Sequence, residues 1–343
     1  MTVLYRKYRP QSFKEVLGQE EVVAALTGAL SLDRVGHAYL FAGSRGTGKT
    51  SVARIFARAL HTSDADLYEI DAASHRQIDD IRALREAVVA PPFSSRYKVY
   101  ILDEVHMLTR DAWNALLKTL EEPPPHALFI LATTEYEKVP ETVLSRCQTF
   151  RFKKPSQRAL KETTEHIAKK EGFAIETPAA ELIALLAEGS YRDAQGVLEK
   201  VMSVTSQKRI TRAEVELVTG APKAQLVIRL IGALEKRDRE EALATIAEVT
   251  SHNYDVALFA RLLLMHLRFI LLLRNAPKTA HEISEEMTPE EFAFLEQCAT
   301  HKESRINSAL LLEFLDAFDL MRTALLPELP LELAVIRLTG QDR

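Results

Sequence analysis

Residues 43–50 have the composition and spacing of a phosphate-binding loop. Three glycines, a lysine and a threonine follow an apolar run at 39–41 and precede a helical pattern. Glycine adopts backbone angles closed to other residues, so successive N–H groups can turn toward an anion at the helix N-terminus. The lysine adds a positive charge for the β- and γ-phosphates, and the threonine hydroxyl is a ligand for Mg²⁺. The residues expected to contact the nucleotide are Gly43, Ser44, Arg45, Gly46, Thr47, Gly48, Lys49, Thr50 and Ser51.

Acidic residues and threonines end two later apolar runs. Asp103 and Glu104 follow 98–102, where the first carboxylate can hold Mg²⁺ and the second can orient or deprotonate an attacking water. An Asp-Glu pair also occurs at ordinary strand ends, but a complete phosphate loop upstream favours hydrolysis. Thr133 and Thr134 end the next run. A hydroxyl there can contact the γ-phosphate or the attacking water, and a plain strand cap is the alternative.

Two arginines could complete the site. Arg146 follows a short helical piece, on the far side of the expected sheet from Lys49, so it could reach the γ-phosphate held by a neighbouring subunit. Arg192 opens a later helix and could bend over the phosphates. The alternatives are a surface charge for Arg146 and a salt bridge to Asp193 or Glu199 for Arg192.

The N-terminal arm, RKYRPQSFKEVLGQ at 6–19, lies just upstream of the phosphate loop. Its proline fixes a turn, and the arm is either a capped N-terminal segment or a surface that packs on the adenine of a nucleotide. In the second case Tyr8, Arg9 and Pro10 are nearest.

Short apolar runs alternate with helical patterns in the first half of the chain. This alternation predicts a doubly wound α/β core with a parallel five-stranded sheet, in which ligands bind at the carboxyl ends of the strands. The expected strands are 39–41, 67–71, 98–103, 128–133 and 149–152.

From residue 155 the pattern becomes helical. It predicts a small helical lid and then an all-α collar, whose apolar segment 258–274 is interpreted as a buried helix and not a membrane span. The expected helices are 156–172, 178–188, 191–206, 223–236, 238–251, 255–274, 288–301 and 304–326. The resulting domains are 1–154 (nucleotide-binding), 155–220 (lid) and 221–343 (collar and oligomerisation).

The composition is that of an ordinary globular chain. Of 343 residues, 47% are hydrophobic and 27% are charged, and the net charge of −4 gives no global basic field for nucleic acid. Cys147 and Cys298 are far apart, so they form neither a disulfide framework nor a four-ligand zinc site. These features fit a reducing cytoplasm.

Six segments together carry a resemblance to a known family. They are RPQSFKEVLGQ, GSRGTGKTS, ILDEVHML, LLKTLEEPP, ATTEYEKVPETVLSRC and GSYRDA. The chain resembles the gamma/tau family of bacterial clamp-loader ATPases, DNA polymerase III subunits within the AAA+ superfamily, through residues 1–205 and more loosely beyond. The resemblance implies that Gly43 to Thr50 form the Walker A loop and Asp103 and Glu104 the Walker B pair. It also implies that Thr134 is sensor 1, Arg146 the arginine finger and Arg192 sensor 2.

The resemblance also implies a cytoplasmic ATPase that needs ATP and Mg²⁺ and loads a sliding clamp on primer-template DNA during replication. Its expected partners are copies of itself, the delta and delta prime subunits, the clamp, and DNA contacted through the backbone, with no membrane. Arg76 and the Ser94-Ser95-Arg96 segment are candidate DNA contacts. A AAA+ motor of the branch-migration helicase type and a non-catalytic nucleotide-bound scaffold are the alternatives.

Two departures from the family are visible in the sequence. The family usually carries a four-cysteine zinc module after the Walker A helix, whereas 59–66 here reads ALHTSDAD. We therefore expect no zinc site. The tau-type extension beyond the collar is also not found within these 343 residues.

Overall fold

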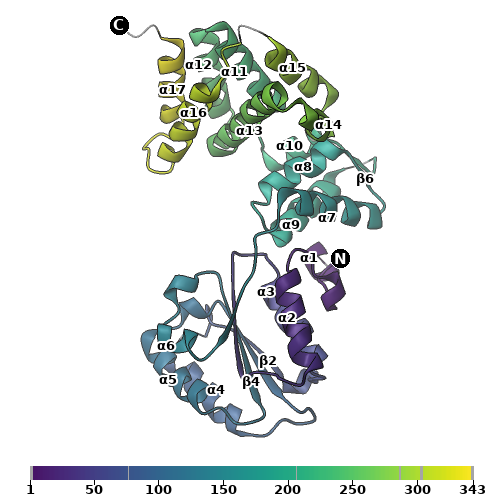
Figure 1. The fold of residues 1–343 in the computed structure, drawn as a ribbon, viewed down its shortest axis with the longest axis vertical. Helices are drawn as coiled ribbons and strands as arrows, with labels where there is room; N and C mark the ends of the chain where they lie inside the picture. Colours follow the sequence, from purple (N-terminus) through teal and green to yellow (C-terminus); the bar gives the residue numbers. More distant parts are fainter. Residues whose placement is uncertain (1–2, 76, 206, 286, 302–303, 341–343) are drawn as a thin grey trace. The chain divides into compact units, whose positions relative to one another are not determined.

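The computed structural model describes most of the chain in two compact units (Figure 1). The described residues are 3–75, 77–205, 207–285, 287–301 and 304–340. The first unit comprises Met1–Thr163 and Ala187–Gly196, and the second comprises Thr164–Leu186 and Val197–Arg343. These bounds differ from the three-domain division, which stays a prediction.

A five-stranded parallel sheet forms the centre of the first unit, in the order β2-β3-β4-β1-β5. Its strands are β1 (Ala38–Ala42), β2 (Leu67–Asp71), β3 (Lys98–Asp103), β4 (Ala127–Thr133) and β5 (Gln148–Arg151). Each coincides with a predicted run, and the predicted α/β core is confirmed. Because β1 lies between β4 and β5, the loop that follows it lies where the strand order changes direction, which is where ligands bind in such sheets.

Helices cover both faces of this sheet (Figure 1). The longer ones are α2 (Glu20–Ser31), α3 (Lys49–Ala59), α4 (Ile78–Val89) and α5 (Arg110–Glu121). The short ones are α1 (Leu4–Lys7), η1 (Phe13–Glu15), η2 (Asp64–Asp66), η3 (Val105–Met107), η4 (Tyr136–Lys138) and α6 (Glu141–Leu144). Tyr100 and Leu102 pack toward α4 and α5, whereas Val99 and Ile101 pack toward α2 and α3. The three central strands β3, β4 and β1 are buried on both faces and appear in the sequence as continuous apolar runs, whereas the edge strands β2 and β5 are more exposed.

The second unit is mostly helical. Its helices are α8 (Thr177–Leu186), α10 (Arg212–Thr219), α11 (Ala224–Lys236), α12 (Arg239–Ser251), α13 (Val256–Asn275), η5 (Pro277–Thr279), α14 (Ala280–Glu285), α15 (Pro289–Thr300), α16 (Ser308–Leu320) and α17 (Leu329–Thr339). Parts of α7 (Gln157–Lys170) and α9 (Tyr191–Val204) belong to each unit. The expectation of helices alone was wrong at β6 (Ala174–Ile175) and β7 (Arg209–Ile210), which pair in parallel. Strands of two residues leave no periodic pattern in a sequence.

The apolar helix α13 lies against α11, α15 and α16. By length and composition alone it could cross a membrane, but 56% of its apolar window is buried inside the fold. A helix that is apolar on nearly every side needs neighbours all round it, and these three helices supply them. The structure thus agrees with the interpretation of this segment as a core helix.

Candidate nucleotide-binding site

The loop between β1 and α3 needs glycine at two positions for different reasons. Gly48 caps α3 with a φ of 98°, a conformation that favours glycine. Gly46 has a φ of 74°, and a Cβ added there would lie 1.9 Å from Ser190 Oγ. Glycine is needed at 48 because of the backbone conformation, and at 46 also because of the close Ser190 side chain. The loop therefore turns tightly against the helix N-terminus, as anion binding requires.

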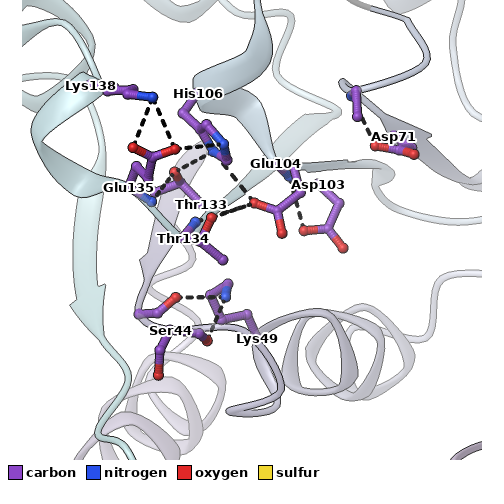
Figure 2. A network of polar contacts seen from close by, with 12 residues as sticks. Ser44, Lys49, Asp71, Asp103, Glu104, His106, Thr133, Thr134, Glu135 and Lys138 are labelled. Atoms are coloured by element: carbon purple, nitrogen blue, oxygen red, sulfur yellow. Dashed lines mark hydrogen bonds and ion pairs between the residues drawn. The ribbon is translucent and has the colours of Figure 1, made fainter. Parts of the chain in front are cut away.

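Lys49 lies inside this loop. Its side chain is nearly buried, and Nζ donates to the carbonyl oxygens of Gly43 at 2.7 Å and Ser44 at 3.0 Å (Figure 2). Burial lowers the pKa of this amine, and the carboxylates of Glu104 and Asp103 oppose that effect. A buried ammonium group needs partners, and phosphate oxygens could replace the two carbonyl oxygens that now accept from it.

Thr50 and Asp103 meet across α3 and β3. The Thr50 hydroxyl donates to Asp103 Oδ2 at 2.7 Å, and Asp103 Oδ1 accepts from the backbone N–H of Glu104 at 3.0 Å. A hydroxyl and a carboxylate are the hard oxygen ligands that Mg²⁺ prefers, so this pair fits Mg²⁺ bound together with phosphates. Within the described ranges no group of three or more His, Cys, Asp or Glu side chains is arranged to hold a metal ion. In a Mg²⁺ site with one or two protein ligands, phosphate and water oxygens would supply the rest.

Glu104 meets the end of β4 (Figure 2). Its Oε2 accepts from the Thr134 hydroxyl at 2.9 Å and from the Thr134 backbone N–H at 3.3 Å. The two residues come together because β3 and β4 are paired, with Leu102 opposite Leu131. The carboxylate pair and Thr134, the predicted sensor, were expected separately from the sequence and form one hydrogen-bonded group.

Arg192 and the N-terminal arm lie close to the phosphate loop. Tyr191 donates its backbone N–H to the carbonyl oxygen of Gly46 at 3.1 Å, so α9 begins against the loop. The Arg192 guanidinium lies over the Tyr5 ring, 4.9 Å from its centroid. The pKa of Arg9 is lowered by burial and by the positive charges of Arg54 and Arg192, although Glu69 opposes them. The arm and the predicted sensor arginine are therefore neighbours.

Arg146 lies near the amino ends of the strands, whereas its own phosphate loop lies at their carboxyl ends. It precedes β5, whose first residue pairs with Tyr39 near the start of β1, whereas the loop follows the end of β1. Its guanidinium donates to Glu121 Oε1 at 2.7 Å and to the carbonyl oxygen of Thr142 at 2.7 Å. This placement agrees with the expectation that Arg146 is remote from Lys49, and its action on a neighbouring subunit stays a prediction.

Gln19 is a residue of this site that the sequence analysis missed. Its side chain is buried, with Oε1 accepting from the backbone N–H of Lys153 at 3.0 Å and Nε2 donating to the Lys153 carbonyl oxygen at 2.8 Å. Nε2 is also 3.5 Å from the carbonyl oxygen of Thr47. A polar residue just before a helix appears in a sequence as a cap, so its link between the arm, the loop and the chain after β5 left no signal.

Asp66 lies at the end of segment 59–66, where we expect no zinc module, and its hydrogen bonds hold this segment in place. Its buried carboxylate accepts from the backbone N–H groups of Ser94 at 3.0 Å and Ser95 at 2.9 Å and from the Ser63 hydroxyl at 3.0 Å. These hydrogen bonds tie the segment to 93–95. The expectation of no zinc stays a prediction.

Two groups of candidate DNA contacts have different outcomes. Arg76 lies outside the described residues. In the other segment the backbone N–H groups of 94–95 are engaged by Asp66, and Arg96 pairs with Asp33 at 2.8 Å. A DNA phosphate would have to compete with both carboxylates there, so this candidate is weakened, and it too stays a prediction.

Comparisons with known proteins agree with this geometry. A family model described as "DNA polymerase III, delta subunit" matches residues 61–156. The chain is 40% identical over 296 residues to the DNA polymerase III subunit tau of Bacillus subtilis (strain 168), covering 80% of this chain and 52% of that protein. It is 40% identical over 274 residues to the corresponding subunit of Escherichia coli (strain K12), covering 74% of this chain and 42% of that protein. The chain thus spans about half the length of the curated relatives it matches.

Solved structures give a likeness of fold. The Holliday junction branch migration motor RuvB of Thermotoga maritima matches with a TM-score of 0.54 at 24% identity, covering 66% of this chain and 79% of that one. At this identity the likeness shows the AAA+ fold alone. The tau proteins, in contrast, match at 40% identity through both units, and the chain belongs to the gamma/tau family of bacterial DNA polymerase III subunits.

Proposed function

We propose that this chain is the ATPase subunit of a clamp loader, which uses ATP binding and hydrolysis to place a sliding clamp on primer-template DNA. The observation that carries the proposal is the convergence of Lys49, the Thr50–Asp103 pair and the Glu104–Thr134 pair at one edge of the sheet. Binding, metal coordination and water activation each have a group there. The family relationship supplies the clamp and DNA as the expected partners.

The residues of the site divide the work by position. Loop N–H groups and Lys49 hold the β- and γ-phosphates, while Thr50 and Asp103 hold Mg²⁺ through oxygen ligands. The ion, when bound, neutralises charge on the phosphate oxygens. Glu104 orients the attacking water or accepts its proton, and Thr134 fixes the carboxylate that does so.

Arg146 completes the scheme from a neighbouring subunit. In one chain it is remote from the phosphate loop, and its guanidinium is one-third exposed in a pair with Glu121. An arginine that reaches the γ-phosphate of the adjacent subunit stabilises transition-state charge only after assembly. Other clamp-loader subunits of the delta and delta prime type and further copies of this chain are the proposed neighbours, and the cytoplasm is the proposed location.

Hydrolysis of ATP by the assembled complex, with and without clamp and primer-template DNA, tests the proposal. We expect stimulation by both ligands, loss of tight ATP binding in Lys49→Ala, and a decrease of about 10³-fold or more in hydrolysis for Arg146→Ala with ATP binding retained. Retained micromolar affinity in Lys49→Ala would refute the phosphate-loop assignment. Unchanged hydrolysis in Arg146→Ala would refute action across the subunit boundary.

Branch migration and a passive scaffold remain as alternative outcomes of the same experiment. A helicase of the RuvB type would respond to branched DNA and not to the clamp. A scaffold would bind ATP without hydrolysing it, although a complete Glu104–Thr134 pair disfavours that result.

A further inference from the structure

His106 is a polar residue beside Glu104 that the scheme above leaves without a role. It lies in η3, directly after β3, and its side chain is 8% exposed. Nδ1 is 3.2 Å from Thr133 Oγ1 and 3.4 Å from Glu104 Oε2, and Nε2 is 3.2 Å from Glu135 Oε1 (Figure 2). Both ring nitrogens are therefore engaged, one of them on the carboxylate assigned to water activation.

The Glu135 side of the ring is itself held in place. Lys138 Nζ lies 2.8 Å from Glu135 Oε2, and the backbone N–H of Glu135 donates to Thr133 Oγ1 at 3.0 Å. The Lys138 ammonium group is the main cause that lowers the pKa of Glu135. The imidazole thus spans two anchored groups, and rotation of the ring would break contacts at both nitrogens.

Glu104 needs such support. Its backbone is in the left-handed region, with a φ of 49°, which is uncommon for a residue other than glycine and persists where the surroundings hold it. The Thr134 hydroxyl, in the residue after β4, donates to Oε2, and His106 Nδ1 in η3 lies 3.4 Å from the same oxygen. In Figure 2 the second oxygen of Glu104 points toward the side of the site on which Lys49 lies. With Oε2 contacted from two sides, the other oxygen on the Lys49 side is the one that could accept a hydrogen bond from an attacking water.

We propose that His106 is a positioning residue for hydrolysis, one that holds the Glu104 carboxylate in its reactive orientation through Nδ1. The inference rests on the ATPase function proposed above. The charged groups around the ring are Glu104, Glu135 and Lys138, together with Arg110, which lines the same surface cavity of about 450 Å³. The polar contacts of the ring described above are to Thr133, Glu104 and Glu135, none of which is in the phosphate loop, so its effect should appear in turnover and not in ATP affinity.

Three substitutions separate positioning from packing. In His106→Asn the amide N–H₂ can take the place of Nδ1, in His106→Gln it can take the place of Nε2, and His106→Ala keeps neither. The control is His126→Ala, which removes another part-buried histidine of the same unit. His126 is hydrogen-bonded to the Val88 carbonyl oxygen, and it directly precedes β4, at the end of the strand opposite the site. ATP dissociation constants, kcat of the assembled complex and melting temperatures are measured for all of them.

We expect kcat to fall roughly 10-fold to 100-fold in His106→Ala and His106→Gln, the range for displaced supporting groups. His106→Asn should recover most of the activity, and the ATP dissociation constant should stay within about 2-fold of wild type in each variant, as for residues that act on the reaction step alone. Wild-type kcat in His106→Ala, or a loss of affinity as large as the loss of kcat, would overturn the inference while leaving the proposed function intact. No rescue by asparagine would also overturn it. If the wild-type complex itself hydrolyses no ATP, the proposed function fails first.

Discussion

A buried ion cluster joins α10 to α13 and α15 in the second unit. Arg212 lies 2.8 Å from Glu291 Oε1 and 3.1 Å from Glu216 Oε1, and His266 Nε2 is 3.8 Å from Glu291 Oε1. The Glu291 side chain is only 3% exposed. Burial alone would raise the pKa of Glu291, but the His266 side chain 3.8 Å away, the charge of Arg212 and the backbone N–H of Thr288 lower it to about 2.

This pKa sets the size of the first prediction. A decrease from 4.5 to about 2 corresponds to about 3 kcal/mol of unfolding free energy, at about 1.4 kcal/mol per pH unit. Glu291→Gln should therefore destabilise the second unit by about 3 kcal/mol at pH 7, near the roughly 3–5 kcal/mol seen when one partner of a buried pair is removed. Because the folded-state pKa is the lower one, this stabilisation is complete above pH 4.5 and is lost as the pH falls through about 2.

Glu216 contributes with the opposite sign. Burial raises the pKa of Glu216, against the effect of Arg212, so its charged form opposes folding at neutral pH and the opposition fades as the pH falls. The difference between the pH–stability curves of wild type and Glu291→Gln removes the part of this contribution that does not depend on Glu291, whose charge is a minor cause of the raised pKa of Glu216. That difference should shrink from about 3 kcal/mol toward zero between about pH 5 and pH 2.

Two spectroscopic signals separate the units in urea unfolding. The chain has one tryptophan, Trp113, in α5 of the first unit, whereas far-UV circular dichroism also follows the helices of the second unit. Glu291→Gln should shift the dichroism transition and leave the tryptophan transition in place. Glu290→Gln, an exposed neighbour in the same helical turn, is the matched control and should change stability by no more than about 1 kcal/mol. A change below about 0.5 kcal/mol in Glu291→Gln, or equal effects of the two substitutions, would refute the reasoning.

Three further predictions concern the first unit. Gly46→Ala should weaken ATP binding at least about 10-fold in a calorimetric titration, because the new Cβ would lie 1.9 Å from Ser190 Oγ and its backbone strain alone is worth about 1–2 kcal/mol. Glu121→Gln should raise hydrolysis by the assembled complex about 1.4-fold to 5-fold, since an exposed pair worth about 0.2–1 kcal/mol no longer holds Arg146 in its own chain; an unchanged or lower rate would contradict this. Asp66→Asn should lower the stability reported by tryptophan fluorescence by about 1–3 kcal/mol at pH 7. Because hydrogen bonds from 93–95 and Ser63 lower the pKa of Asp66 despite its burial, that difference should vanish in strong acid, and a difference independent of pH would exclude the carboxylate as its source.

The types and spacing of residues close in the sequence made the α/β core and much of the site predictable. The apolar runs of β1, β3 and β4 predicted these strands because both of their faces are buried, and the glycine–lysine–threonine spacing predicted the loop because only such residues suit that turn. Asp103, Glu104 and Thr134 could be predicted as site residues because they are polar residues that directly follow or end buried apolar strands in the sequence. The boundary between the units was not predictable, because α7 and α9 each continue through it without a break in pattern.

The sequence by itself determined the residues of the phosphate loop, the carboxylate pair and the order of the strands in the α/β core, because each depends on neighbours close in the chain. Only the tertiary structure decided that Glu104 meets Thr134 and His106, that Gln19 reaches Lys153, and that Arg146 pairs with Glu121. These contacts join residues on different elements, and the pairing of strands and the packing of helices bring them together. A polar side chain whose partner is many residues away leaves no periodic signal, so its role appears only in the fold.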